Sequence, residues 1–332
     1  MTKIKYYFKR LFALDYKNMW RLAGEISKEH KRSRLYILID MVICSLRYQA
    51  GYMEYFEYEF FLLNHKQRQT FMTTGKAHQI IMKYNQREQR YKFADKTVFN
   101  EIFKDFIGRD YIDVRESTVE ELQAFMEKYQ VVMAKRNDAM MGDGVERVDV
   151  KDIKDFSAFH AKLLEQRQFL IEEFFVQHED MSKLYPDSVN TLRVITFFDG
   201  KDVHVLESIL KIGNGGHLDN FGAGGMYTIL DENGVVKYPA FDMLAKAYTN
   251  HPITGTPIVG FQVPNFDILL ETMDRAARVV PEIQYVGWDV AIGQVKPALI
   301  EGNYNTGVFQ MKPSLTGEKI GLVPRYRSII DF

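Results

Sequence analysis

The chain has 332 residues, 46% of them hydrophobic and 26% charged, a composition typical of a globular protein with a sizeable core rather than a disordered or fibrous chain. Its formal net charge of −1 excludes the overall basicity typical of nucleic-acid-binding proteins. The single cysteine, Cys44, excludes an internal disulfide and a cysteine-based zinc site, so we expect it to be a small core residue in a reducing compartment.

The N-terminal segment lacks the pattern of a signal peptide, because basic side chains alternate with aromatic ones in residues 1–22. The apolar run at 35–46 is too short to cross a membrane and contains Asp40. We therefore expect a soluble, cytoplasmic protein with at most peripheral membrane contact. Residues 1–22 allow two interpretations, a helix with one face in the core or a segment that touches an acidic membrane surface.

The distribution of proline and glycine divides the chain into two regions. All nine prolines lie at or after Pro186, and 16 of the 22 glycines lie beyond that point. Because proline breaks helices, this distribution predicts a mainly helical region before residue 186, with one strand-rich interruption. Residues 21–49 have helical spacing, and a helix within 117–130 is predicted to begin with a capping box formed by Thr118 and Glu121.

From about residue 128 the pattern alternates between strands and helices. The dipeptide Asp199-Gly200 predicts the turn of a hairpin, and a helical pattern ends before Pro281. The order of elements lacks the strand–helix–strand repeat of a doubly wound sheet, so we expect an α+β fold with mostly antiparallel strands. The predicted strands lie at 129–135, at 168–175, in hairpin 191–212 and in hairpin 288–303, and the predicted helices at 155–167 and 265–281.

The hairpin at 288–303 places oxygen-donor side chains on otherwise apolar strands. Side chains alternate along a strand, so Glu301 and Asn303 face the same way, and Asp289 can lie opposite them. Two carboxylates and one amide oxygen suit Mg²⁺, or Mn²⁺, and magnesium bound in this way usually also binds the phosphates of a nucleotide. The alternative is a solvated hairpin face that carries ordinary acids.

A second group of residues suits phosphate binding. Lys135 ends a predicted strand and precedes a loop that contains Gly142 and Gly144, where backbone amides can approach phosphate oxygens. Lys96 can add a second positive charge. The alternatives are an ordinary glycine turn and a solvated helical lysine. The sequence contains neither a P-loop nor a protein-kinase catalytic loop.

A third group lies in the middle of the predicted sheet. Arg193 occupies an otherwise apolar strand, where a buried guanidinium needs an anionic partner, and Lys211 can lie near it across the hairpin. Both can instead belong to salt bridges within the sheet. His217, Asp219 and Asn220 lie in a glycine-rich segment that suits close approach to a ligand. Of these, Asn220 can hold a substrate or metal oxygen, and His217 is more simply a polar loop residue.

These motifs, in this order, resemble the ATP-grasp superfamily and, more narrowly, the sugar-transfer-associated ATP-grasp family. The resemblance covers about residues 90–330 and implies two α+β subdomains that clasp ATP, preceded by a helical region. It implies boundaries of 1–90 for the helical region and of 91–180 and 181–332 for the subdomains. The motifs that carry it are "DK" with Lys96, Lys135 before "GDGV", "LIEEFFVQH" 170–178, "SVNTLRV" 188–194, "DNFGAGG" 219–225, "HPITG" 251–255, "WDVAI" 288–292 and "IEGN" 300–303.

The resemblance also implies roles for individual residues. Lys96 and Lys135 would hold the ATP phosphates under the loop 142–144, and Asp289, Glu301 and Asn303 would bind two magnesium ions. Arg193 would contact the γ-phosphate and the reacting carboxylate. Glu179, or the adjacent Asp180, would bind the ribose. Lys211 and Asn220 would act with Arg193 as in glutamate-adding ligases, and the adenine would lie against the hinge residues Glu172, Glu173, Phe174 and Phe175.

One position departs from a related branch. D-alanine–D-alanine ligase-like proteins carry an arginine two residues before the metal-binding aspartate, and this chain has Gly287 there. The role of that arginine must then fall to Arg193, as in the glutamate-adding branch. A small α/β domain at the N-terminus, usual in the superfamily, is also not evident.

The function implied is that of an ADP-forming carboxylate–amine ligase that uses ATP and Mg²⁺. Its substrates would be small molecules, one of them possibly sugar-linked, in surface-polysaccharide biosynthesis alongside other glycan-assembly proteins. A second hypothesis is a sugar phosphotransferase with His217 or Asp219 as base. A third is a nucleotide-binding scaffold without turnover, which the complete set of site residues disfavours.

Overall fold

The computed structural model describes residues 15–137, 144–244 and 246–332. The chain divides into two compact units, Met1–Ala77 with Gln310–Arg327, and His78–Phe309 with Ser328–Phe332. The boundaries suggested by the sequence at residues 90 and 180 stay a prediction. In the described ranges, no helix has both the length and the apolar character needed to cross a membrane.

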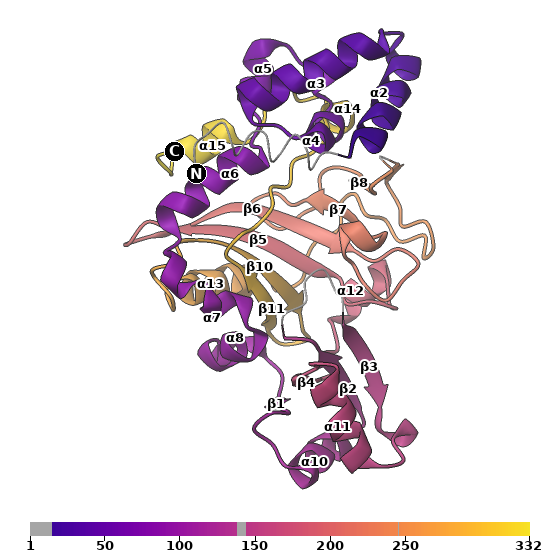
Figure 1. Cartoon of the computed structure of the whole chain (residues 1–332), viewed down its shortest axis with the longest axis vertical. Coiled ribbons are helices and arrows are strands. Elements are labelled where there is room, and N and C mark those ends of the chain that lie inside the picture. Colours follow the sequence, from indigo (N-terminus) through magenta and orange to yellow (C-terminus); the bar gives the residue numbers. More distant parts are fainter. Residues whose placement is uncertain (1–14, 138–143, 245) are drawn as a thin grey trace. The chain divides into compact units, whose positions relative to one another are not determined.

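The first unit is built from helices around its own apolar core (Figure 1). In α3 the side chains of Ile37, Met41, Cys44 and Tyr48 recur at helical spacing and are buried, so Cys44 is a core residue as predicted. Residues 1–14 of the predicted basic segment lie outside the described residues. The elements of this unit are α2 Tyr16–His30, α3 Arg34–Tyr48, α4 Tyr52–Glu57, η1 Phe60–Leu62, α5 His65–Gln69, the start of α6 Thr74–Tyr84, α14 Pro313–Thr316 and α15 Val323–Arg327.

A buried ion pair lies inside this helical core. The guanidinium of Arg68 donates to both carboxylate oxygens of Asp40 at 2.7 Å, and the Tyr55 hydroxyl donates to the same carboxylate at 2.7 Å. Burial raises the pKa of the adjacent Cys44 thiol to about 12, so this cysteine stays protonated. Asp40, the acid in the apolar run 35–46, is therefore a buried structural residue whose charge is neutralised by Arg68.

Removal of one partner of this pair is expected to destabilise the helical unit. Arg68→Met leaves Asp40 buried without its cation, which costs about 3–5 kcal/mol in the free energy of unfolding. Asp40→Leu combined with Arg68→Met is expected to recover most of that loss, because no buried charge remains. Chemical denaturation followed by circular dichroism measures both, with Arg21→Met at the exposed Arg21–Glu25 pair as the control. Equal losses at the two pairs would contradict the assignment.

A second carboxyl in this unit gives the fold a pH dependence. Burial and the nearby charge of Glu54 raise the pKa of Glu57 from 4.5 to about 7, against the opposing charge of Lys312. A carboxyl whose pKa is higher in the folded state stabilises the fold fully below pH 4.5, and this contribution is lost as the pH rises to 7. Glu57→Gln should therefore raise stability at pH 8 by about 1–3 kcal/mol and change it little at pH 4.5. Thermal unfolding at both pH values measures this, and an equal effect at both would contradict it.

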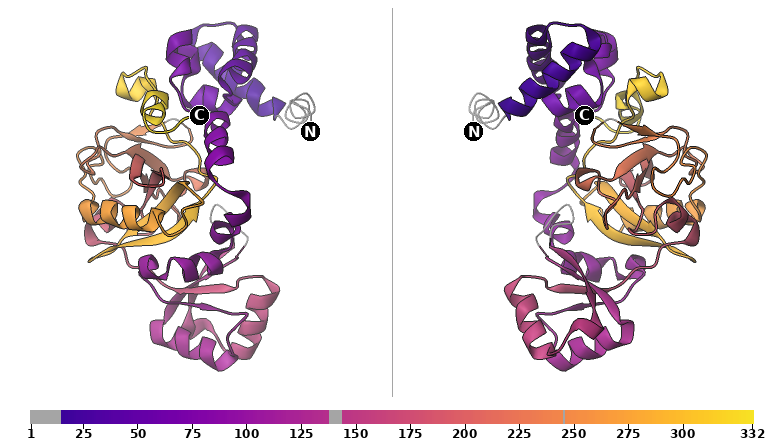
Figure 2. Two further views of the ribbon diagram at one scale, coloured as in Figure 1. Left: turned by 90° about the vertical axis from the view of Figure 1, so that its left-hand side faces the viewer. Right: turned by 90° about the vertical axis from the view of Figure 1, so that its right-hand side faces the viewer.

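The second unit contains a four-stranded antiparallel sheet in the order β1-β4-β2-β3. Two helices pack on it and enclose a small core (Figures 1 and 2). The predicted capping box is confirmed, since the Thr118 side chain accepts from the Glu121 amide and the Glu121 side chain from the Thr118 amide. The elements are β1 Tyr111–Asp113, α10 Val119–Tyr129, β2 Val131–Lys135, β3 Val145–Asp149, η3 Val150–Asp152, α11 Phe156–Glu165 and β4 Leu170–Glu173.

A larger antiparallel sheet follows, with seven strands in the order β11-β10-β5-β6-β7-β8-β9. The predicted hairpins are both present, β5 with β6 around Asp199-Gly200 and β10 with β11. The elements are α12 Glu179–Leu184, β5 Thr191–Phe198, β6 Val203–Ile212, η4 Phe221–Ala223, β7 Met226–Ile229, β8 Ala240–Phe241, β9 Ala247–Tyr248, α13 Phe266–Ala277, β10 Tyr285–Ile292 and β11 Pro297–Asn303. Before the small sheet come the rest of α6, η2 Arg87–Gln89, α7 Tyr91–Ala94, α8 Lys96–Ile102 and α9 Lys104–Ile107.

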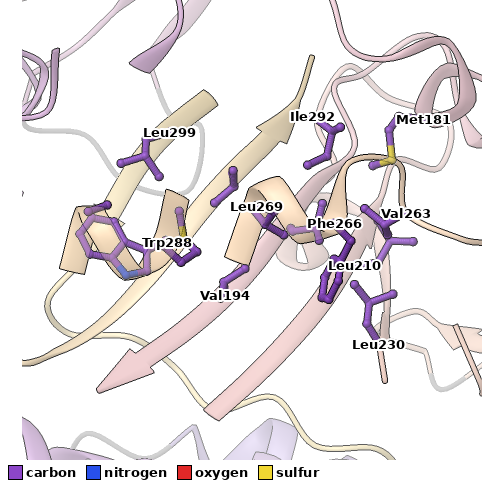
Figure 3. Close-up of a cluster of buried hydrophobic side chains, with 14 of the residues drawn as sticks. Met181, Val194, Leu210, Leu230, Val263, Phe266, Leu269, Trp288, Ile292 and Leu299 are labelled. Atoms are coloured by element: carbon purple, nitrogen blue, oxygen red, sulfur yellow. The ribbon is translucent and has the colours of Figure 1, made fainter. Parts of the chain in front are cut away.

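One face of the large sheet carries the main core. Alternate residues of the central strands, among them Val194 of β5, Leu210 of β6 and Trp288 of β10, pack against Leu269 of α13 (Figure 3). The phenylalanines of α7 and α8 join the same cluster. Because side chains alternate along a strand, the residues between these core positions project from the opposite face. The predicted α+β fold with mostly antiparallel strands is confirmed.

Candidate functional site

The predicted oxygen donors lie on the face of the large sheet opposite this core. Asp289 of β10 and Glu301 of β11 are directly paired in the antiparallel register, with a bulge between Asp289 and Val290. Asn303 donates from Nδ2 to Glu301 Oε1 at 3.2 Å. A bulge re-aims a side chain, and here the extra residue is Ile300 of β11, directly before Glu301. The hairpin thus brings two carboxylates and one amide together.

The two predicted cations of the neighbouring strands converge on the same aspartate. Arg193 of β5 donates from Nε to Asp289 Oδ1 at 2.7 Å and from Nη2 to Oδ2 at 2.8 Å. Lys211 of β6 lies with Nζ 3.0 Å from Asp289 Oδ1. Asp289 and Lys211 are buried and Arg193 is largely so. Four strands of one sheet therefore contribute to a single charged cluster, formed by Arg193, Lys211, Asp289 and Glu301.

The pKa values of the two carboxyl groups in this cluster are shifted in opposite directions. Burial alone would raise the pKa of Asp289, but the charges of Arg193 and Lys211 outweigh it and hold that pKa well below its usual value. Burial and the adjacent charge of Asp289 raise the pKa of Glu301. Asp289 is therefore ionised at neutral pH, whereas Glu301 is more readily protonated than an ordinary glutamate.

A third predicted group lies on the small sheet. Lys135 of β2 forms an ion pair with Glu172 of β4, and Arg109 donates from Nη2 to the other oxygen of Glu172 at 2.6 Å. Asn100 of α8 donates to that oxygen at 2.8 Å. Although burial would raise it, the charges of Arg109 and Lys135 keep the pKa of Glu172 low. The Glu172 carboxylate therefore positions the Lys135 ammonium, which lies at the strand end next to the glycine loop.

Lys96 and Gly144 both contact Arg136, the residue that follows Lys135 in the sequence. Lys96, the first residue of α8, donates from Nζ to the Arg136 carbonyl at 3.0 Å. Gly144 has a φ of +66°, and a Cβ there would lie 2.3 Å from Arg136 Cδ, so a glycine is needed at this position. Gly142 lies outside the described residues.

The predicted hinge leads from β4 to the end of β10. Phe175 lies close to Gly293, and the amide of His178 donates to the Ile292 carbonyl at 2.6 Å. Phe174 is exposed, with the Arg147 guanidinium 5.3 Å from its ring centroid. Glu179 is the exposed first residue of α12. The roles expected of Glu173, Phe174, Phe175 and Glu179 stay predictions.

The glycine-rich segment after β6 is held by its own side chains. Asn220 accepts from the Gly222 amide at 3.0 Å, and Asp219 accepts from the amide and hydroxyl of Thr191 at 2.8 and 2.5 Å. His217 is exposed beside the Asp187 carbonyl. Asp219 thus fixes the segment to Thr191 at the start of β5, two residues before Arg193. Its carboxylate is already engaged in these hydrogen bonds.

The model of the sugar-transfer-associated ATP-grasp family matches residues 76–321, which is 246 of the 332 residues. The chain belongs to this family. The match confirms the resemblance that the motifs suggested and includes every predicted site residue of this ATP-grasp protein.

Several solved structures are similar to this ATP-grasp chain at low sequence identity. The ATP-grasp ligase PsnB in complex with a minimal precursor is 12% identical, with 82% of this chain and 73% of PsnB covered at a TM-score of 0.46. D-alanyl-alanine synthetase A from Vibrio cholerae is 10% identical, with 71% and 60% covered at 0.41. D-alanine-D-alanine ligase from Helicobacter pylori is 14% identical, with 70% and 62% covered at 0.43. Because these TM-scores are low, they indicate no role for any individual residue of this chain. No curated protein matches the chain.

Gly287, two residues before Asp289, lies in close contact with two neighbouring side chains. A Cβ at residue 287 would lie 2.1 Å from Thr306 Oγ1 and 3.2 Å from Arg193 Cδ. Arg193 also donates from Nη1 to Thr306 Oγ1 at 3.2 Å. The volume that an arginine at 287 would need is thus filled by Arg193 and Thr306.

Gly287→Ala is therefore expected to damage the site. The added methyl group must displace Thr306 or Arg193, which costs about 1–3 kcal/mol in stability and lowers ATP turnover. Gly307→Ala is the matched control, because a Cβ there meets nothing within 4 Å. Thermal unfolding and an ADP-release assay on both variants measure the effect. A Gly287→Ala variant as stable and active as its control would contradict the close approach.

Three residues of the site were missed from the sequence. Arg109 and Asn100 complete the pocket of Glu172, and Thr306 supports Arg193. They lie 63, 72 and 113 residues from their partners, so no local pattern reports the pairing. Of these three residues, only Arg109 gave a signal in the sequence. It lies between the apolar residues of α9 and β1, and an arginine buried there requires an acidic partner.

Proposed function

We propose that this ATP-grasp protein is an ATP-dependent ligase that joins a carboxylate to an amine through an acyl phosphate. Family membership supports the ATP-dependent part. The observation that carries the chemistry is the charged cluster on the large sheet, in which Arg193 and Lys211 flank Asp289 and Glu301. Such a group of preformed charges stabilises phosphoryl transfer and the oxyanion of an acyl intermediate without a covalent enzyme nucleophile.

The proposed reaction has two steps. The carboxylate of the acid attacks the γ-phosphorus of ATP, and ADP leaves, which gives the acyl phosphate. The amine then attacks the acyl carbon, and phosphate leaves with one oxygen of the original carboxylate. In this scheme Arg193 binds the γ-phosphate and the reacting carboxylate, then stabilises the oxyanion of the tetrahedral intermediate. Lys211 and Asn220 assist it.

The remaining predicted residues would bind ATP. Lys96 and Lys135 would hold the phosphates, with the loop around Gly142 and Gly144 above them. The segment from Glu172 to Phe175 would lie against the adenine, mainly through its backbone and the phenylalanine rings, because the Glu172 carboxylate is already engaged. Glu179 would bind the ribose.

The residues of the hairpin fit a magnesium ion. Among the described residues, no group of three His, Cys, Asp or Glu side chains could hold a metal ion. Asp289, Glu301 and Asn303 supply two carboxylates and one amide, so water and ATP phosphates would complete the coordination of the metal. The carboxyl groups of Asp289 and Glu301, directly paired across the two strands, suit a divalent cation. When bound, magnesium would neutralise the phosphate charge, and Mn²⁺ would suit the same donors.

The substrates we propose are an amino acid or amine and a sugar-linked acid, or an amino sugar and an acid, in cytoplasmic steps of surface-polysaccharide biosynthesis. The family description, which associates these proteins with sugar transfer, supports this choice. The phosphotransferase hypothesis is less favoured, because a sugar hydroxyl needs a general base, whereas a carboxylate is already ionised. Both bases considered are poorly suited, since Asp219 is bonded to Thr191 and His217 is exposed.

Trapping with hydroxylamine tests the proposed reaction. The protein is incubated with ATP, Mg²⁺ and single candidate uronic acids or amino acids, with hydroxylamine as the amine. We expect hydroxamate and ADP in equal amounts with a true substrate acid. ADP accompanied by a phosphorylated sugar would instead support the phosphotransferase. ATP binding without turnover on any acid or sugar would support the scaffold.

A further inference from the structure

Helix α3 of the helical unit is apolar on two sides. One side, with Ile37, Met41, Cys44 and Tyr48, is buried in the core. The other side carries six apolar residues that are each exposed by 46–66%. A helix that is apolar all round normally has partners all round. The exposed side, which we call the outer face of α3, consists of Leu35, Tyr36, Ile39, Val42, Ile43 and Leu46.

The spacing of these residues makes one continuous stripe. Leu35, Ile39, Val42 and Leu46 recur at intervals of four, three and four, and Tyr36 and Ile43 lie beside them. Scattered exposed apolar residues are normal on a soluble protein, but a stripe of six along about three turns of one helix marks a binding surface. No acidic residue interrupts it, because Asp40 points into the core toward Arg68.

Helix α2 carries two exposed aromatic side chains, and one of them, Trp20, contacts the first residue of α3. Trp20 and Tyr16 are one turn apart and each 54% exposed. The guanidinium carbon of Arg34, the first residue of α3, lies 4.6 Å from the centroid of the Trp20 ring. Exposed tryptophan and tyrosine next to a basic side chain are typical of the interfacial region of a lipid bilayer.

Basic residues are concentrated in the N-terminal part of the sequence, which includes α2 and α3. Residues 1–48 contain eleven Lys and Arg against four Asp and Glu, whereas the remaining residues contain 32 against 40. One of the four acids, Asp40, is neutralised by Arg68. Lys17, Lys28 and Lys31 are exposed on α2 and at its end. The segment that carries the apolar stripe is thus strongly basic in a chain that is otherwise acidic.

We propose that the outer face of α3 binds the surface of an anionic membrane. The apolar stripe would lie among the acyl chains near the headgroups, Trp20 and Tyr16 would lie at headgroup level, and the lysines would pair with anionic lipid phosphates. The apolar stripe and the lysines are both needed. An apolar stripe alone does not distinguish anionic from neutral lipid, and isolated lysines bind lipid weakly. A second copy of the chain fits less well, because two such basic segments would repel each other.

Vesicle binding of the full chain tests this proposal. Sedimentation with vesicles of phosphatidylcholine is compared with vesicles that also contain phosphatidylglycerol, at low and high salt. We expect binding only to the anionic vesicles, weakened several-fold by salt. Tryptophan emission gives an independent readout, because Trp288 is buried and Trp20 is the exposed one of the two tryptophans. It should shift to shorter wavelength on the anionic vesicles.

Variants separate the two parts of the surface. Ile39→Ser with Leu46→Ser should weaken partitioning by more than about tenfold. The control is Val295→Ser with Ile320→Ser, which replaces apolar residues outside the stripe that are even more exposed, and it should bind as the native chain does. Lys17→Gln, Lys28→Gln and Lys31→Gln together should remove the preference for anionic lipid.

The proposal is overturned by any of three results. The first is equal binding to neutral and anionic vesicles, and the second is unchanged binding of the Ile39/Leu46 variant. The third is that the chain does not bind vesicles but dimerises reversibly in sedimentation velocity, and that the Ile39/Leu46 variant does not dimerise. The last result would identify a second copy of the chain as the occupant.

Discussion

Asp289→Asn is expected to reduce ADP formation by at least about 10³-fold at saturating ATP. Asp289 is paired with Arg193 and Lys211 and lies opposite Glu301, so the substitution removes one of the carboxylates proposed to hold the metal. It also leaves two buried cations without their anion. A coupled assay of ADP release measures the loss, and thermal unfolding reports whether the variant folds.

Two further variants keep this prediction informative if Asp289→Asn is unstable. Glu301→Gln replaces a carboxyl whose pKa is already raised with a neutral group of the same shape, so it should preserve stability and still lose activity. Asp274→Asn is the matched control, because Asp274 forms a similar two-point pair with Arg278 on an exposed helix face. Full activity of Glu301→Gln would exclude the proposed metal site.

Arg193→Lys is expected to lower kcat by about 10²–10³-fold with little effect on folding. Lysine keeps the charge beside Asp289 but loses the planar fork that bonds both carboxylate oxygens and Thr306. If Arg193 stabilises the transition state, kcat falls much more than the affinity for ATP. Steady-state kinetics and equilibrium ATP binding measure the two effects separately.

Arg278→Lys is the control for this substitution. It changes the same two-point contact at the exposed Asp274 pair and should leave kcat unchanged. An Arg193→Lys variant with normal kcat but weaker ATP binding would show that Arg193 only binds the nucleotide. The oxyanion role would then have to be abandoned.

Features with local periodicity could be predicted from the sequence. The hairpin of β10 and β11 was predicted because apolar residues flank a short turn, and strand alternation then places Asp289 beside Glu301. Arg193 stood out because an arginine in an apolar strand needs an anion. The capping box at Thr118 was predicted because it depends on residues three apart.

Features that depend on long-range packing could not be predicted. The pairing of Arg109 and Lys135 with Glu172 joins a loop to two strands and is visible only once the small sheet is assembled. The bond from Thr191 to Asp219 likewise depends on the path of a loop. Gly287 was read as a missing arginine, and only the structure shows that Thr306 fills its space. Side-chain volume in three dimensions leaves no trace in a linear pattern.

Transfer of carboxylate oxygen to phosphate tests the central claim most directly. The protein is incubated with ATP, Mg²⁺, an amine and a candidate acid labelled with ¹⁸O in its carboxyl group, and the released phosphate is analysed by mass spectrometry. An acyl-phosphate ligase must place one ¹⁸O atom in each phosphate that it releases. Amide product or ADP formed together with unlabelled phosphate would contradict the proposed ligase chemistry.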